Sequence, residues 1–243
     1  MHDALSSKAA LRLALRPSAY ASPAPRSFFL SSVSRRRLRP GSHLHYHVRV
    51  RLPAQSHTNM PPTPVLETPR LLLRPMELAD AEQIQRLFPQ WEIVRHLAAR
   101  IPWPYPSDGA LAFIRDECLP AVARGEGWSW TVRLKSNPER LIGGIDLRTK
   151  KGEHRGFWLI PELRGRGLMI EAADAATDFW FEVLRFPVLR TSKAAANIAS
   201  RRVSEKQGMR MVGSEERDYV SGRQLTEIWE ITADEWRARK RNG

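Results

Sequence analysis

The chain has too few cysteines for a disulfide framework. Cys118 is the single cysteine among 243 residues, so an intrachain disulfide and a zinc site built from cysteines are both excluded. No apolar run approaches the ~18 residues that a membrane-spanning helix requires. The composition, 42% hydrophobic and 27% charged, is that of a globular protein with a hydrophobic core. These absences exclude a disulfide scaffold, and we expect no membrane partner.

Acidic residues are almost missing from the first 60 positions. This segment has ten Lys and Arg residues against Asp3 alone, and it is rich in Ser, Pro and Ala. We therefore predict a disordered basic tail over residues 1–64. Two origins fit it: a mis-called start with Met60 as the working initiator, or a targeting segment resembling an organellar transit peptide. The first origin predicts a cytoplasmic protein, and the second predicts organellar import.

The tail also supplies most of the net charge of +13. Beyond Met60 the chain has 29 basic and 25 acidic residues, with the two signs mixed. This balance gives no argument for a nucleic-acid surface, so we expect no nucleic-acid partner. Residues 43–52 alternate with period 2 and place three histidines on one face. They predict either a strand with a conceivable metal site or a loose segment, and we expect no bound metal.

From residue 65 to residue 240 the pattern predicts one domain. Strand-like segments occupy 67–76, 127–135, 141–149, 155–161, 187–195, 209–220 and 224–232. Helical spacing occupies 78–88, 108–122, 171–184 and 199–208, with the second of these broken by Pro120. Gly143 and Gly144 within a strand indicate a bulge or a close backbone approach. The order of segments predicts the α/β (α+β) class, with a mixed, largely antiparallel sheet.

The stretch PELRGRGLMIEA, residues 161–172, joins a strand to a helix through two glycines. A helix N-terminus carries unpartnered N–H groups and partial positive charge, and glycine lets an anion approach them. Arg164 and Arg166 add cations that suit phosphate oxygens. The spacing matches neither a P-loop nor a dinucleotide fingerprint. It fits a pyrophosphate cradle without a metal ion, or a plain turn with exposed arginines.

Two linked stretches, RGFWLIPELRGRGLMIEAADAATDFWF and NIASRRVSEKQGM, resemble the GNAT superfamily of acyl-CoA-dependent N-acetyltransferases. Together with LETPRLLLRPMELADAEQI, they are most similar to its branch of ribosomal-protein-alanine acetyltransferases (RimJ/RimL-like). The resemblance covers residues 65–236. It implies about seven strands flanked by about four helices, with splayed central strands. It also implies acetyl-CoA as cosubstrate, no metal, and direct transfer to an amine of a small molecule or a protein N-terminus.

The family's pyrophosphate loop reads Gln/Arg-x-x-Gly-x-Gly/Ala. Arg164 and Gly167 fill its first and fourth places, whereas Met169 stands where a small residue is usual. Asn197 and Ser200 match the branch's Asn-x-x-Ser. The coenzyme-binding residues that the resemblance implies are Trp158, Leu159, Ile160, Arg164, Gly165, Arg166, Gly167, Leu168, Met169, Asn197 and Ser200.

Catalytic groups are harder to assign from the sequence. Many relatives have a general-acid tyrosine two residues before the lysine of the second motif, and Ser204 stands there. Ser200, Ser204 and His154 are the candidate catalytic residues, with Asp146, Glu153 and Glu227 as further candidate bases. A second reading is a non-catalytic acyl-CoA-binding module of the same fold. Five aromatic residues form a candidate acceptor pocket or else pack in the core: Trp91, Trp103, Tyr105, Trp128 and Trp130. We expect a monomer or a homodimer.

Overall fold

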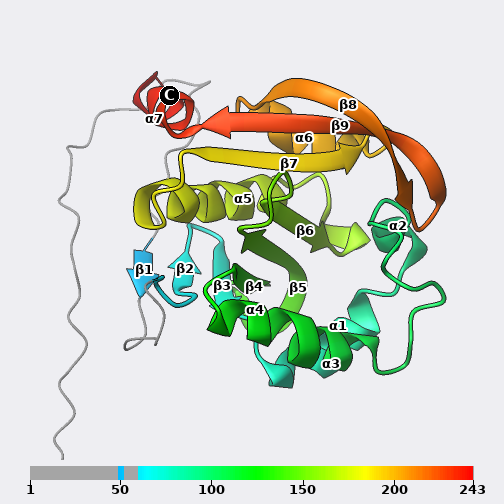
Figure 1. Cartoon of the computed structure of the whole chain (residues 1–243). Coiled ribbons are helices and arrows are strands. Elements are labelled where there is room, and N and C mark those ends of the chain that lie inside the picture. The colour runs from blue at the N-terminus through cyan, green and yellow to red at the C-terminus, as the bar shows by residue number, and fades with distance from the viewer. Residues whose placement is uncertain (1–48, 52–59, 243) are drawn as a thin grey trace, which may run out of the picture. The chain divides into compact units, whose positions relative to one another are not determined.

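The computed structural model describes residues 49–51 and 60–242, shown in Figure 1. The strands are β1 (Arg49–Arg51), β2 (Val65–Glu67), β3 (Leu71–Pro75), β4 (Gly127–Leu134), β5 (Asn137–Arg148), β6 (Arg155–Leu159), β7 (Val188–Ala194), β8 (Arg210–Tyr219) and β9 (Gly222–Thr232). The α-helices are α1 (Ala81–Leu87), α2 (Trp91–Val94), α3 (Gly109–Ala112), α4 (Leu119–Ala123), α5 (Leu168–Asp178), α6 (Ile198–Lys206) and α7 (Ala233–Asn242).

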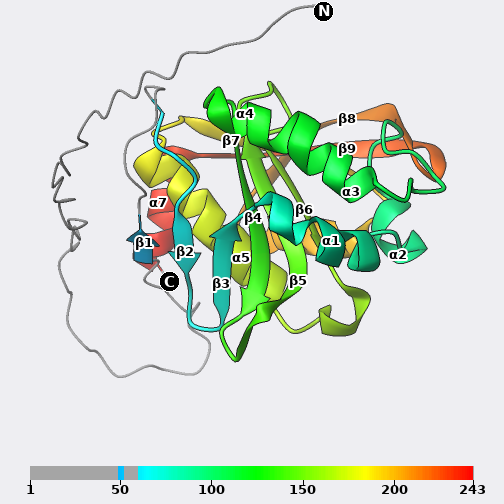
Figure 2. The same ribbon diagram turned by 90° about the horizontal axis from the view of Figure 1, so that it is seen from below.

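The strands form two sheets in which every paired neighbour is antiparallel. One sheet has the order β1-β2-β3-β4-β5-β6 and the other has the order β7-β9-β8. Helix α5 covers one face of the larger sheet, and α1, α3 and α4 cover its other face (Figures 1 and 2). This arrangement confirms the predicted mixed, largely antiparallel α/β fold.

The described part of the chain has nine strands, against about seven predicted. The two additional strands, β1 and β2, are only three residues long, too short for a periodic signal. β1 pairs with β2, and the indole N–H groups of Trp128 and Trp130 donate to the carbonyls of Pro61 (2.9 Å) and Pro64 (2.6 Å). Residues before position 65 therefore also contact the fold. The three histidines at positions 43–47 lie outside the described residues.

The helical segment around Pro120 does not break there, so that prediction is wrong. α3 continues through a π-helical segment, Phe113–Cys118, directly into α4, with Pro120 at the second position of α4. Proline disrupts a helix because it has no N–H and its ring meets the carbonyl four residues earlier. The wider π turn changes the backbone hydrogen-bond pattern just before Pro120. The chain can therefore remain helical.

Gly143 and Gly144 of β5 allow β6 to lie unusually close. A Cβ added at Gly143 would stand 2.4 Å from the backbone oxygen of Trp158, and one at Gly144 would stand 2.8 Å from its indole nitrogen. Side chains at these two positions would therefore displace β6. The predicted close backbone approach is confirmed.

Candidate active site

Strands β6 and β7 meet where β6 begins, opposite the middle of β7, and then part. The backbone N–H of His154 donates to the carbonyl of Arg190 (2.8 Å), and the hydroxyl of Thr191 donates to the carbonyl of Arg155 (3.3 Å). The two strands run in roughly the same direction (Figure 1). Among the described residues, no hydrogen bond joins them beyond these positions. We call this parting the β6–β7 splay.

The free edge of β6 faces the splay with backbone groups. The carbonyl of His154 accepts from Arg148, and Ile160 N–H donates to Ile142, so the even-numbered residues of β6 pair with β5. In an antiparallel pair the intervening residues turn their N–H and C=O groups to the opposite edge. Phe157, two positions beyond Arg155, therefore presents its N–H and C=O to the splay. Such an edge suits an extended, amide-containing ligand.

The glycine loop, residues 164–168, follows β6 after a 3-10 turn, Pro161–Leu163. Gly165 and Gly167 have φ values of +76° and +75°, which other residues adopt only with strain. The first backbone bond of α5 joins the N–H of Glu171 to the carbonyl of Gly167 (3.2 Å). Within the described chain, no hydrogen bond uses the amides of residues 165–170. The loop therefore combines free donors with the positive end of a helix, as an anion site requires.

Side chains leave one side of this loop open. A Cβ added at Gly165 would meet no atom within 4 Å, and Arg166 is exposed. Leu168 and Met169 are buried in the main hydrophobic core, so the thioether of Met169 packs away from the loop amides. The unusual methionine in the family's small-residue position is therefore compatible with an anion at the loop.

The guanidinium of Arg164 turns back from the loop. It donates to the carbonyl of Leu159 (3.3 Å) and to the carbonyl of Glu92 in α2 (3.1 Å). Burial is the main cause that lowers the pKa of Arg164 below its usual value. This side chain ties α2 to the end of β6. The expectation that it bonds a phosphate does not match its position here, whereas Arg166 remains exposed for that role.

Asn197 and Ser200 lie together at the start of α6. The side-chain oxygen of Asn197 caps the helix by accepting the backbone N–H of Ser200 (3.1 Å). The amide nitrogen of Asn197 and the half-buried hydroxyl of Ser200 are the groups left for a ligand. Asn197 is therefore a helix cap, and its amide nitrogen leaves room for a second role.

Ser204 has no exposed surface, and its hydroxyl accepts a hydrogen bond from the Lys193 ammonium (2.7 Å). A side chain with no exposed surface cannot touch a ligand without movement, so Ser204 is poorly placed as a direct proton donor. Burial, with a smaller contribution from Arg155, lowers the pKa of Lys193 to about 7. Arg155 and Glu227 are also buried nearby. We call Arg155, Lys193, Ser204 and Glu227 the buried polar cluster.

Within this cluster the two cations lack close carboxylate partners. Arg155 donates to the hydroxyl of Thr177 (2.9 Å), and its Nε has no partner. Glu227 instead accepts from the indole of Trp229 (2.9 Å) and pairs with Arg201 (3.3 Å). Arg155 therefore carries a buried positive charge near the closed end of the splay, whereas Lys193, with a pKa of about 7, is only about half protonated at pH 7.

His154 is held by structural contacts at the closed end of the splay. Its Nδ1 accepts the backbone N–H of Arg190 (2.9 Å), and its ring stacks on Trp180 at 5.0 Å. Burial, then the neighbouring Arg190 charge, lower the pKa of His154. The imidazole is therefore neutral at pH 7, but the structure places it before β6, whereas the glycine loop follows β6.

The other candidate bases are engaged in ion pairs. Asp146 pairs with Arg148, and Glu153 pairs with Lys150 (2.7 Å) and Arg217 (2.8 Å). Burial raises the pKa of Glu153, but its bonds and charges from Lys150 and Arg217 outweigh this and lower the pKa below its usual value. Neither pairing identifies a base.

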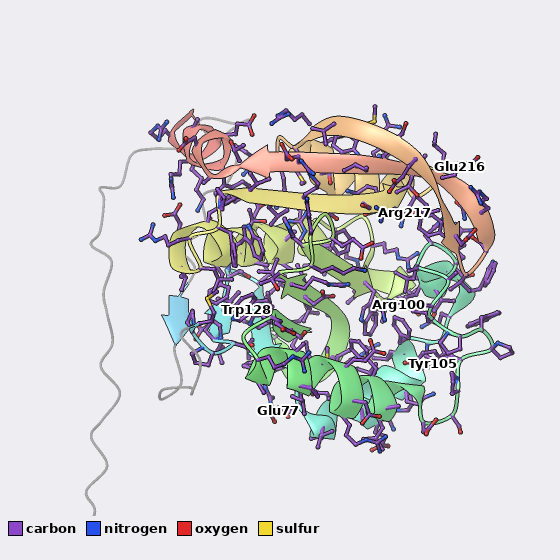
Figure 3. The ribbon with its side chains drawn as sticks, viewed as in Figure 1. Glu77, Arg100, Tyr105, Trp128, Glu216 and Arg217 are labelled. Carbon is purple, nitrogen blue, oxygen red and sulfur yellow. The ribbon has the colours of Figure 1, made fainter. Side chains whose placement is uncertain are left out.

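The five candidate aromatic residues divide into two groups. Trp128 and Trp130 are fully buried against Phe179, so they are core residues. Trp91 and Trp103 are 42% and 43% exposed, and their rings lie 5.7 Å apart. Tyr105 packs against Phe88 beside α3, well apart from Trp128 (Figure 3). Only the exposed tryptophans and Tyr105 remain candidates for an acceptor surface.

The described residues contain no group of three or more His, Cys, Asp or Glu side chains arranged to hold a metal ion. None of their helices is both long enough and apolar enough to cross a membrane.

Comparison with known proteins identifies the family. Residues 70–210, more than half of the chain, match the family described as Acetyltransferase (GNAT) domain. The chain therefore belongs to the GNAT family of N-acetyltransferases, which confirms the resemblance seen in the sequence and the class of enzyme.

Individual relatives are distant. The Bacillus subtilis (strain 168) protein "Uncharacterized N-acetyltransferase YnaD" is 24% identical over 182 residues, 70% of this chain and 98% of that protein. The ribosomal-protein-S5-alanine acetyltransferase of Vibrio fischeri has a TM-score of 0.60 at 16% identity, over 71% of this chain and 98% of that one. RimL, a ribosomal L7/L12 α-N-protein acetyltransferase in complex with coenzyme A, has a TM-score of 0.59 at 13% identity, over 69% and 96%. At these identities, the structures support the fold alone.

Proposed function

We propose that the protein transfers an acetyl group from acetyl-CoA directly to a primary amine, of a protein N-terminus or of a small molecule. One observation carries this proposal: a loop with unused amides stands at the open end of the β6–β7 splay. Family membership supplies the reaction class. RimL, a relative of the same fold, is described with coenzyme A bound. A diphosphate with an extended, amide-bearing arm matches the loop and the free strand edge together.

In this proposal the amides of residues 165–169 hold the diphosphate, aided by Arg166. The N–H and C=O of Phe157 and the N–H of Leu159 pair with the extended arm, and Asn197 and Ser200 complete the site from α6. Acetyl-CoA supplies an activated acetyl thioester. The chain's own task is to hold and orient that group at the narrow end of the splay. The buried guanidinium of Arg155 lies near this end and favours negative charge there.

The acceptor amine must be neutral to react. Neutralising a lysine side chain at pH 7 costs about 4–5 kcal/mol, but an α-amine costs only about 1 kcal/mol. The candidate carboxylate bases are committed to ion pairs, and the Nδ1 of His154 is occupied by the backbone N–H of Arg190. Without a strong base, α-amines and other weakly basic amines are the favoured acceptors. Trp91, Trp103 and Tyr105 offer an apolar surface for the rest of the acceptor.

The test is turnover with acetyl-CoA against peptides with free N-termini, polyamines and aminoglycosides. We expect thiol release above background with at least one amine, and faster release with α-amines than with lysine side chains. Calorimetric binding of coenzyme A without turnover on any acceptor would instead support the non-catalytic module. If calorimetry detects no binding of coenzyme A, both the acetyltransferase and the non-catalytic binding module are refuted.

A further inference from the structure

The turn between β2 and β3 holds a buried carboxylate beside the glycine loop. Glu171, in the first turn of α5, has a side chain that is only 1% exposed. It accepts hydrogen bonds from the hydroxyl of Thr68 (2.5 Å), the backbone N–H of Arg70 (2.9 Å) and the Nε of Arg70 (2.6 Å). The turn is itself ordered, because the Thr68 hydroxyl accepts the N–H of Leu71 (2.9 Å). Three donors therefore fix one end of α5 to a segment about a hundred positions earlier.

Arg70 also reaches the loop itself. A terminal nitrogen of its guanidinium donates to the carbonyl of Arg166 (3.0 Å), and the other lies 3.5 Å from the position of a Cβ added at Gly167. One side chain thus bridges the helix carboxylate and the loop backbone. The rigid fork of guanidinium suits such a bridge, whereas an ammonium on a single stem does not.

The Arg166 carbonyl sets the direction of an amide. In a planar trans peptide, the C=O of one residue and the N–H of the next point in opposite directions. By holding the Arg166 carbonyl, Arg70 turns the N–H of Gly167 away from itself, toward the other side of the loop. Gly167 could otherwise rotate this peptide plane freely, because glycine has few conformational limits.

Charge gives a second reason for the bridge. A carboxylate in the first turn stabilises a helix, but it also opposes an anion bound at the same helix end. The Arg70 guanidinium compensates the Glu171 charge on the side away from the open loop face. The loop therefore keeps the positive helix end available to an incoming phosphate.

We propose that Arg70 is a positioning residue for the glycine loop: its bridge between Glu171 and the Arg166 carbonyl sets the Gly167 amide and the charge that receive the coenzyme diphosphate. This inference rests on the proposed function for the identity of the ligand. Its structural part, the ordering of the loop, does not. Arg70 acts through the loop backbone.

The experiment compares Arg70→Gln and Arg70→Lys with Arg86→Gln in the full chain. Arg86 is a matched control, because it forms an exposed ion pair with Glu82 (2.9 Å) on α1. The two readouts are calorimetric binding of coenzyme A and of pantetheine, and amide hydrogen exchange of Glu171 without ligand. The N–H of Glu171 donates to the carbonyl of Gly167 (3.2 Å), so its exchange reports the order of the loop, and we call it the loop exchange. We expect Arg70→Gln to weaken coenzyme A binding about ten-fold, the effect of losing one charge-assisted hydrogen bond. It should leave pantetheine binding unchanged and speed the loop exchange several-fold.

Arg70→Lys should fall between wild type and Arg70→Gln, because a lysine reaches Glu171 or the Arg166 carbonyl but not both. Arg86→Gln should match wild type in every readout. Unchanged loop exchange in Arg70→Gln would overturn the proposal, and so would equal weakening for coenzyme A and pantetheine, which indicates a general structural loss. If wild type binds no coenzyme A, the proposed function fails and so does the coenzyme part of this inference. The loop exchange then decides the ordering part alone.

Discussion

The glycine loop and the buried polar cluster, the two parts of the proposed site, are built by opposite means. The loop offers backbone amides, with glycine conformations of positive φ at positions 165 and 167. The cluster offers buried side chains, of which Arg155 and Lys193 are cations without close carboxylate partners. Backbone amides carry no titratable proton, so the loop's recognition is independent of pH. The cluster's charge depends on pH, because burial has moved the pKa of Lys193 to about 7.

The largest expected effect comes from adding a side chain to the loop. Gly167→Val places a β-branched residue at φ +75° and crowds the neighbouring amides. We expect a loss of coenzyme A affinity of about 100-fold, near 3 kcal/mol, measured by calorimetry.

Gly152→Val is the matched control for this substitution. Gly152 has φ +79° and no atom within 4 Å of an added Cβ, so it suffers similar strain away from the loop. It should lose comparable stability but keep its coenzyme A affinity. Equal loss of affinity in the two variants would refute the loop as the binding element.

The second prediction concerns the cluster and its pH dependence. The folded-state pKa of Lys193, about 7, lies below its ordinary value of 10.5. Between these values the unfolded chain binds one proton more than the folded chain, so this lysine makes the free energy of unfolding rise with pH. The rise is at most about 1.4 kcal/mol per pH unit, and it ends below pH 7 because both states are then protonated.

Lys193→Met should remove this rise, and denaturant unfolding at pH 7, 8 and 9 measures it. The exposed Lys151 provides the control, because Lys151→Met should keep the wild-type pH dependence. Parallel curves for wild type and Lys193→Met would show that the buried ammonium is not perturbed.

The smallest expected effects separate two roles at the start of α6. Asn197→Ala removes the helix cap and should lower the free energy of unfolding by about 1 kcal/mol. Asn197→Ser keeps a capping oxygen but lacks the amide nitrogen, so it should keep the stability. It should weaken coenzyme A binding about five-fold, the value of one neutral hydrogen bond. Wild-type binding by Asn197→Ser would leave Asn197 as a cap alone.

The sequence predicts the loop better than the cluster, for a physical reason. The glycines, the arginines and the following helix are adjacent in the chain, so spacing alone indicates an anion site. The close approach at Gly143 was likewise readable from local pattern, whereas the splayed edge of β6 was implied by the family resemblance alone. The contact of Lys193 with Ser204 joins strand β7 to helix α6. Its effect on the pKa of Lys193 comes from burial, which the sequence pattern does not reveal. The position of Ser204 made it a weak candidate for the general acid. In the structure it is wholly buried, and its hydroxyl accepts a hydrogen bond from Lys193.

Other features could not be predicted either, because they depend on contacts between distant positions or on packing. Arg70 was not among the predicted site residues, because its partners lie 96 and 101 positions away. The π-helical segment before Pro120 keeps the chain helical through a changed hydrogen-bond pairing, whereas proline by itself predicts a break in the helix. Trp128 and Trp130 alternate with polar neighbours, and only the packed core distinguishes them from pocket residues.

Gly143 and Gly144 have a consequence for ligand size. Because neither has a side chain, the carbonyl and the indole of Trp158 lie directly against β5. An alanine at Gly143 would push β6 toward β7 and narrow the β6–β7 splay. In the proposed site, Gly143 and Gly144 of β5 thus influence the width of the β6–β7 splay, although neither residue contacts the ligand.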